Sequence, residues 1–147
     1  MKITIDVIGL PVSQGSLTRA KYGLRYSNAK ILSVWRETVV NSLLAVKSKD
    51  WQNDGAFSVT AIFRFQRPLA HTNKKGLLKP SAPKHKSTKP DTDKLQRAIG
   101  DSLEMAAIIK NDSQICEWLA KKCYCIGQEP PGVHMTITNL NLVNHDT

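Results

Sequence analysis

The sequence predicts an α/β (α+β) domain, in which two main helices pack on a small mixed β-sheet. Two stretches place apolar residues on one helical face, and four others alternate apolar and polar residues as half-buried strands do. A long basic segment separates these elements. The length of 147 residues suits one domain, residues 1–147, that buries a core of its own.

The chain opens with "KITIDVI", residues 2–8, where Ile3, Ile5 and Val7 alternate with polar residues. This period of two predicts a half-buried strand. In residues 9–26, glycine, proline and basic residues interrupt any regular pattern. An irregular basic loop is expected there.

A helix is predicted from Ser27, a candidate N-cap, to about Lys47. Apolar residues recur along one of its faces, at Ile31, Trp35, Val39, Leu43 and Val46. We therefore expect Trp35 in the core.

The next strand is "AFSVTAIFRF", residues 56–65, whose apolar residues occupy alternate positions. One face carries Phe57, Val59, Ala61, Phe63 and Phe65, and the other carries Ser58 and Thr60. This pattern indicates a sheet that is covered on one side.

The basic segment from Gln66 to Pro90 holds seven Lys or Arg, four of the seven prolines and no acidic residue. Loops of this length in a compact domain are usually functional or disordered. Two interpretations stay open: a solvated segment without fixed contacts, or a loop that embraces nucleic acid. His71 and His85 are expected to be solvated rather than catalytic.

A second helix is predicted from near Asp93 to about Ala106, with its apolar residues opposite a charged face. Ile108 and Ile109 should then start a short extended piece. Two strands follow, in "SQICEWLAKKCYCI" and in "VHMTITNL". Trp118 and Tyr124 are expected to pack on their strand, although stacking on a base is an alternative.

The three cysteines, Cys116, Cys123 and Cys125, are odd in number and match no common zinc spacing. Reduced thiols on a buried or half-buried strand are the expectation, and they fit an intracellular protein.

The net charge of +9 and the pI near 9.6 favour a polyanionic partner, and nucleic acid is the leading candidate. No apolar run approaches the roughly 20 residues that span a membrane, and no signal peptide is evident. We expect a cytoplasmic protein with no membrane partner and no small-molecule cofactor.

Four aspartates gather around the second helix, at Asp91, Asp93, Asp101 and Asp112. Asp91 and Asp93 straddle the helix entry, and Asp112 could join them if the following strand runs back along the helix. Three such carboxylates supply the oxygen ligands that Mg²⁺ or Mn²⁺ prefers. Two alternatives remain, namely that the first two only cap the helix and that Asp101 pairs with Arg97.

Taken together, "KPDTDKLQRAIGDSLEMAAIIKNDSQI", residues 89–115, resembles the RusA family of Holliday junction resolvases. The family pattern reads Pro-Asp-x-Asp-Asn-Leu-x-Lys, then Asp-Ala-Leu, then Asp-Asp-x-Gln-Ile. The likeness is strong from Lys89 to about Tyr124 and weak at "GLPVSQGS". It implies a homodimeric, Mg²⁺-dependent endonuclease, often phage or prophage encoded, that resolves four-way DNA junctions by paired symmetric nicks in recombination and repair.

By this resemblance Asp91, Asp93 and Asp112 hold the metal, Mg²⁺ with Mn²⁺ as a substitute, and Arg97 completes the catalytic set. Three residues depart from the pattern, at Lys94, Arg97 and Asn111. Basic residues near the site are expected to bind DNA: Lys74, Lys75, Lys84, Lys86, Lys89, Lys94 and Lys122. A catalytically weak or inactive branched-DNA-binding protein, or a nuclease for other branched DNA, remains the alternative.

Overall fold

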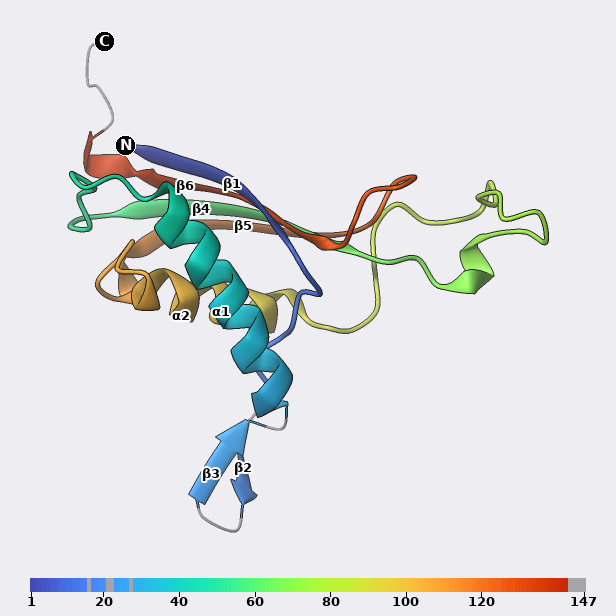
Figure 1. Cartoon of the computed structure of the whole chain (residues 1–147), viewed down its shortest axis with the longest axis horizontal. Coiled ribbons are helices and arrows are strands. Elements are labelled where there is room, and N and C mark those ends of the chain that lie inside the picture. The colour runs from blue at the N-terminus through green and yellow to red at the C-terminus, as the bar shows by residue number, and fades with distance from the viewer. Residues whose placement is uncertain (16, 21–22, 27, 143–147) are drawn as a thin grey trace.

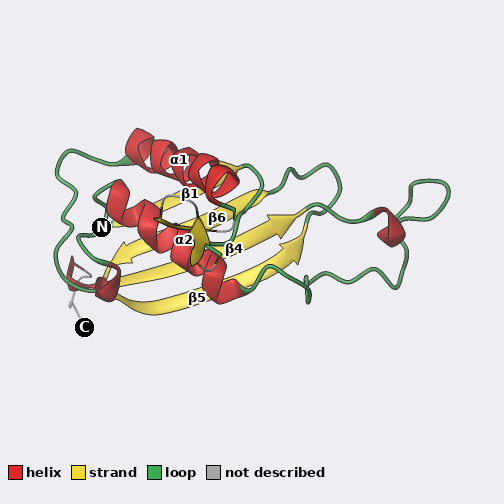
Figure 2. Ribbon diagram, turned by 90° about the horizontal axis from the view of Figure 1, so that it is seen from below, coloured by secondary structure: helices red, strands yellow, loops and turns green. Residues whose placement is uncertain are grey.

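The computed structural model describes residues 1–15, 17–20, 23–26 and 28–142. A four-stranded sheet in the order β1-β6-β4-β5 forms its body. Its strands are β1 (Lys2–Ile8), β4 (Phe57–Phe65), β5 (Ile115–Tyr124) and β6 (Gly132–Asn139), and its helices are α1 (Ala29–Val46) and α2 (Thr92–Met105). Both helices cover the same face of the sheet (Figures 1 and 2). The predicted α+β class and mixed sheet are therefore confirmed.

The sheet is mixed because it contains both antiparallel and parallel pairs of strands. β6 lies between β1 and β4 and is antiparallel to both, whereas β5 is parallel to β4. Parallel neighbours need a long crossover connection, and here that connection contains α2. The crossover places α2 beside the strand that follows it.

The core lies between the sheet and the two helices. One row across the sheet joins Ile5, Met135, Ala61 and Ala120, since these residues pair in register. Phe57 and Phe63 are fully buried on the same face, and each such side chain contributes about 1.5–3 kcal/mol relative to exposure. The predicted alternation of β4 is confirmed.

The first helix has a slightly different buried face from the predicted one. Leu32, Trp35, Val39 and Leu43 are buried, whereas Ile31 and Val46 are exposed. The i, i+3, i+4 stripe thus starts one residue later than the sequence suggested, but Trp35 does lie in the core. The helix follows Asn28, and the predicted cap Ser27 lies outside the described residues.

The prediction of an irregular loop over residues 9–26 was wrong in part. A short antiparallel hairpin forms there, of β2 (Leu17–Ala20) and β3 (Gly23–Tyr26), and it extends from the start of α1 (Figure 1). Four-residue strands that lack alternating apolar residues carry too weak a periodic signal to be recognised.

The extended piece predicted at Ile108 and Ile109 was also wrong. Both residues are fully buried in the turn that ends α2, where the Ile108 N–H donates to the Leu103 carbonyl at 2.9 Å. A short 3₁₀ helix, η2 (Asp112–Gln114), then leads into β5. The two isoleucines are apolar because they are buried in the core, and not because they belong to a strand.

Residues 66–90, here called the arm, project away from the body and return to α2 (Figures 1 and 2). Contacts fix the base of the arm, so the interpretation of this stretch as a solvated segment without fixed contacts was wrong. Arg67 donates from Nε to the Cys125 carbonyl at 3.0 Å and from Nη1 to the Pro83 carbonyl at 2.7 Å. The returning chain pairs with the edge of β5, since the Tyr124 N–H donates to the Lys84 carbonyl at 2.9 Å.

The predicted thiols are free, but their surroundings differ. Cys116 is exposed, Cys123 is half-buried, and Cys125 is buried just after β5. Burial, together with the nearby Glu129 carboxylate, raises the pKa of the Cys125 thiol. In the part of the chain that the structure describes, no helix is both long and apolar enough to cross a membrane.

Candidate active site

Two of the predicted carboxylates lie at the entry of α2. Asp91 is the N-cap residue and Asp93 belongs to the first turn, and both are exposed. The Lys94 Nζ lies 3.8 Å from the Asp91 Oδ2, and the Arg97 Nη2 lies 3.9 Å from the Asp93 Oδ2. Exposed pairs of this length contribute about 0–1 kcal/mol, so both carboxylates can turn toward another cation.

The third carboxylate, Asp112, follows α2 in the chain and lies beside Gly100 of that helix. The Cβ of Asp112 would be 3.8 Å from a Cβ placed on Gly100, and its backbone N–H donates to the Glu104 Oε1 at 2.6 Å. Gly100 follows Asp91 by nine residues, which corresponds to about 13 Å along a helix axis. β5 does run back along α2, but Asp112 precedes it and therefore stays level with Gly100.

Asp93 and Asp112 thus lie along one side of α2, Asp91 lies at its N-cap, and the three aspartates do not form a closed cluster. Asp93, Arg97, Gly100 and Glu104 fall within about 60° of one another around the helix axis. Among the described residues, no three His, Cys, Asp or Glu side chains gather closely enough to hold a metal ion. Exposed carboxylates with weak partners nevertheless suit a hard cation in kind.

Asp101 serves a different purpose from the predicted pairing with Arg97. Its Oδ2 lies 3.4 Å from the Nη1 of Arg36, which belongs to α1. The pairing prediction was wrong because Asp101 is rotated toward the neighbouring helix. Asp101 therefore joins the two helices, and Arg97 keeps Asp93 as its nearby acid.

Lys122 holds the segment that leads into Asp91. Its Nζ donates to the carbonyl of Thr88 at 2.6 Å and to that of Pro90 at 2.8 Å. The sequence predicts a phosphate contact for Lys122. Hydrogen bonds from a lysine to backbone carbonyls leave no pattern in a sequence, so these two bonds could not be foreseen. Two of its three N–H groups are committed to the backbone just ahead of the first aspartate.

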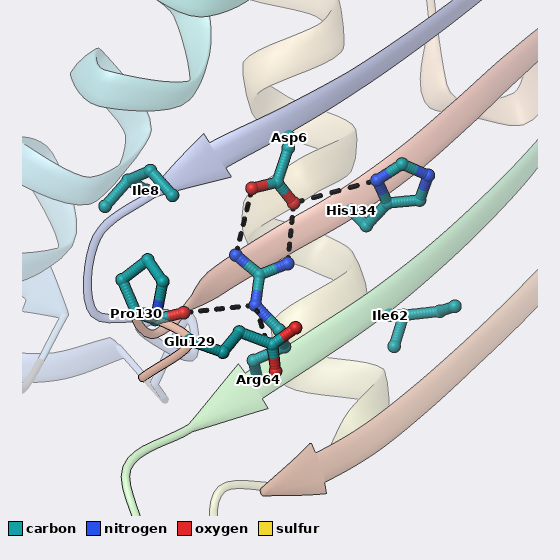
Figure 3. Close-up of a pocket in the computed structure, with 7 residues that line it drawn as sticks. All are labelled: Asp6, Ile8, Ile62, Arg64, Glu129, Pro130 and His134. Atoms are coloured by element: carbon teal, nitrogen blue, oxygen red, sulfur yellow. Dashed lines mark hydrogen bonds and ion pairs between the residues drawn. The ribbon is translucent and has the colours of Figure 1, made fainter. Parts of the chain in front are cut away.

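A cavity of about 420 Å³ opens elsewhere, on the sheet face that the helices leave uncovered, and it contains a buried arginine (Figure 3). Arg64 donates to both oxygens of Asp6, at 2.6 and 3.1 Å, and to the Pro130 carbonyl at 3.1 Å. Burial lowers the pKa of Arg64, but the hydrogen bonds and charge of Asp6 raise it more. A Cβ on Gly132 would lie 2.8 Å from the Arg64 Nη2, so the glycine leaves room for this bridge. This arrangement joins β1 and β4.

A smaller cavity, of about 330 Å³, lies directly at Asp91. Its lining comprises Ser13, Lys89, Pro90, Asp91 and Lys94. The neighbouring Gln14 N–H donates to the Lys94 carbonyl at 3.0 Å, which brings the early segment to the site. Only the weak match at "GLPVSQGS" signalled this segment, and no residue pattern predicted its place.

The remaining predicted DNA-binding lysines occupy two environments. Lys74, Lys75 and Lys84 are exposed on the arm. The Lys86 Nζ instead lies 5.4 Å from the ring centroid of Tyr124, which is buried and also has His71 against its edge. Tyr124 therefore packs as expected, and the expectation of a solvated His71 was wrong. Trp118 packs partly buried against the core.

Comparison with known proteins gives one clear finding. The family model described as Endodeoxyribonuclease RusA matches residues 10–138, which is most of the chain. No curated protein matches the sequence. The match includes the early segment, the arm, the aspartates of α2 and the strand with Lys122. The chain therefore belongs to the RusA endodeoxyribonuclease family.

Proposed function

We propose that this protein is a Mg²⁺-dependent endodeoxyribonuclease that resolves four-way DNA junctions by paired symmetric nicks. The observation that carries the proposal is the placement of Asp91 and Asp93 at the entry of α2, and of Asp112 beside Gly100 of the same helix, in a chain of the RusA family. Roles in recombination and repair, a bacterial cytoplasmic location and a phage or prophage origin belong to the same proposal.

Asp91, Asp93 and Asp112 would hold one or two Mg²⁺ ions, with Mn²⁺ as a substitute. When bound there, such an ion would supply a water of lowered pKa and a positive charge beside the scissile phosphate. Asp91 and Asp93 are exposed at the α2 entry, where an ion that they hold would be open to a phosphate oxygen. Asn111 precedes the third aspartate and caps η2 by accepting from the Ser113 N–H at 2.9 Å.

Arg97 would bind the phosphate and stabilise the charge of the transition state. Its guanidinium is exposed, lies one turn beyond Asp93, and presents a planar fork that matches two phosphate oxygens. Arginine does not release a proton at neutral pH, so the role is electrostatic. Lys122 would act through the backbone, by fixing the segment that carries Asp91.

Lysines around the site would supply most of the DNA affinity through phosphate contacts: Lys74, Lys75, Lys84, Lys86, Lys89 and Lys94. These contacts do not depend on base sequence, so selectivity for a junction must come from DNA shape. Paired nicks require two sites related by a twofold axis, and we propose a homodimer for this reason.

The proposal is tested by comparing Asp91→Asn with Asp101→Asn, because both remove one carboxylate from the same region. Cleavage of a four-way junction in Mg²⁺ should be lost in Asp91→Asn, while junction binding is kept. Asp101→Asn should still cleave, since Asp101 pairs with Arg36. Cleavage by Asp91→Asn at the wild-type rate would contradict the assignment.

One contact favours a second candidate, a catalytically weak or inactive protein that binds branched DNA. The Lys94 ammonium lies 3.8 Å from Asp91 and competes there with a metal ion. Such a protein would bind junctions without nicking them in Mg²⁺ or Mn²⁺. Lys94→Asn should then restore cleavage.

A further inference from the structure

A groove that is larger than the cavity at Asp91 lies between the arm and the turn that joins β5 to β6. Its volume is about 850 Å³. Leu77 and Leu78 of the arm form part of one wall, Ile126 belongs to the opposite wall, and Arg67 and Lys84 also line it. We call this space the arm groove.

The arm wall of the groove is preformed by its own hydrogen bonds. The Asn73 N–H donates to the Leu77 carbonyl at 2.8 Å, and the Lys79 N–H donates to the His71 carbonyl at 2.9 Å. The Asn73 Oδ1 also accepts from the Lys75 and Leu77 N–H groups, at 2.9 and 3.0 Å. Arg67 fixes the base of the arm, so the two leucines are held in place without a partner.

The apolar side chains of the groove are open to solvent. Leu77 is 61% exposed, Leu78 is 53% exposed and Ile126 is 66% exposed. Exposed apolar side chains that gather around one depression indicate a binding surface. A ligand with flat apolar faces would cover all three.

The basic arm that forms one wall of the groove favours an anionic ligand. The arm holds seven Lys or Arg and no acidic residue. The acidic lining residue Glu129 is already engaged, with its Oε1 accepting from the Ile126 N–H at 3.2 Å and lying 3.9 Å from the Arg64 Nε. From Lys84 the chain continues directly into Asp91. The groove is thus connected by a short basic segment to the proposed site of cleavage.

We propose that the arm groove receives nucleobases that are unstacked at the branch point of the DNA substrate. Apolar side chains contact base faces, while basic residues hold the flanking phosphates. Unstacking is least costly where a base already lacks a stacked neighbour, so the groove favours branched DNA over linear duplex. The inference rests on the proposed function and names the feature of the substrate that is recognised.

The test uses the double variant Leu77→Ser/Ile126→Ser and the control Leu44→Ser, an equally exposed leucine on the outer side of α1. The probes are a four-way junction and a linear duplex, each with 2-aminopurine at the same central position, in EDTA. Wild type and Leu44→Ser should raise the fluorescence on the junction several-fold. The double variant should lose this rise and about tenfold in junction affinity, with little change on linear duplex.

Other outcomes would overturn the inference. Unchanged fluorescence and affinity in the double variant would show that the groove does not receive bases, while the proposed function would stand if the junction is still cleaved in Mg²⁺. An altered oligomeric mass of the double variant would instead assign the groove to self-association. Failure of the wild-type protein to bind any junction would overturn the proposed function together with the inference.

Discussion

Arg97 is the residue whose chemistry most constrains the reaction. It stands where the RusA pattern has lysine, on the exposed side of α2 one turn beyond Asp93. A guanidinium binds two phosphate oxygens at once, whereas an ammonium can also give up a proton when its pKa is lowered. An electrostatic role therefore survives this exchange, and proton donation does not.

Replacing Arg97 separates these two roles. Arg97→Gln should slow junction cleavage by about 10²–10³-fold, since it removes charge stabilisation from the transition state. Arg97→Lys should retain most of the activity, because it keeps the charge. Single-turnover rates across pH are the measurement. A much faster Arg97→Lys with a new basic limb in its pH profile would show that a proton donor was missing.

At the scale of elements, α2 and β5 act as one unit. The helix carries Asp91 and Asp93, and the strand returns beside it so that Lys122 can reach the carbonyls of Thr88 and Pro90. The parallel β4–β5 pairing requires this return. The approach of Asp112 to Gly100 depends on the same crossover, since η2, which contains Asp112, lies between α2 and β5 in the chain.

Lys122→Met should therefore damage cleavage more than binding. Loss of both hydrogen bonds releases the segment before Asp91, and misplacement by about 1 Å can reduce catalysis by about 10²-fold. Junction affinity and its salt dependence should stay close to wild type. Lys121→Met is the control, since this exposed neighbour lies on the opposite face of β5.

A direct contact between Lys122 and a phosphate predicts a different result. If its main partner is a phosphate, Lys122→Met should weaken junction binding and lower the salt slope by about one. Titration of the protein with Ca²⁺, followed by calorimetry, gives a further readout. A positioning role predicts weaker ion binding in Lys122→Met and unchanged binding in Lys121→Met.

Elements with a long, regular apolar pattern were predictable from the sequence, whereas short elements without such a pattern were not. β4 and α2 were predicted within a residue or two, because each has a long, regular apolar pattern. The β2–β3 hairpin was missed, since its strands are too short to show one. The resemblance to the RusA family singled out Asp91, Asp93 and Asp112, but the level of Asp112 along α2 depends on a tertiary turn that buries Ile108.

At the scale of the whole molecule, Arg64 links two strands on the face of the sheet that α1 and α2 leave uncovered. Its side chain crosses Gly132 to reach Asp6, so that β4 and β1 are joined across β6 (Figure 3). The Arg64 side chain is only 9% exposed, whereas that of Asp6 is 43% exposed. This bridge also fixes the turn before β6 through the Pro130 carbonyl.

Asp6→Ala should accordingly lower the free energy of unfolding by about 1–3 kcal/mol, since it leaves buried donors without a partner. Lys110→Gln removes the exposed partner of Asp54 and should change this free energy by less than about 1 kcal/mol. Urea unfolding of both variants provides the comparison. Equal effects would show that the Arg64 bridge contributes no more than a surface pair.

We propose that this basic protein cuts branched DNA with Asp91, Asp93 and Asp112. The most direct measurement is incubation of the purified protein with end-labelled four-way junction and matched linear duplex, in Mg²⁺ or EDTA, with the cuts mapped on all four strands. We expect symmetric, ligatable nicks in the junction alone that disappear in EDTA. Tight junction binding without nicks in Mg²⁺ or Mn²⁺, or equal cutting of linear duplex, would contradict it.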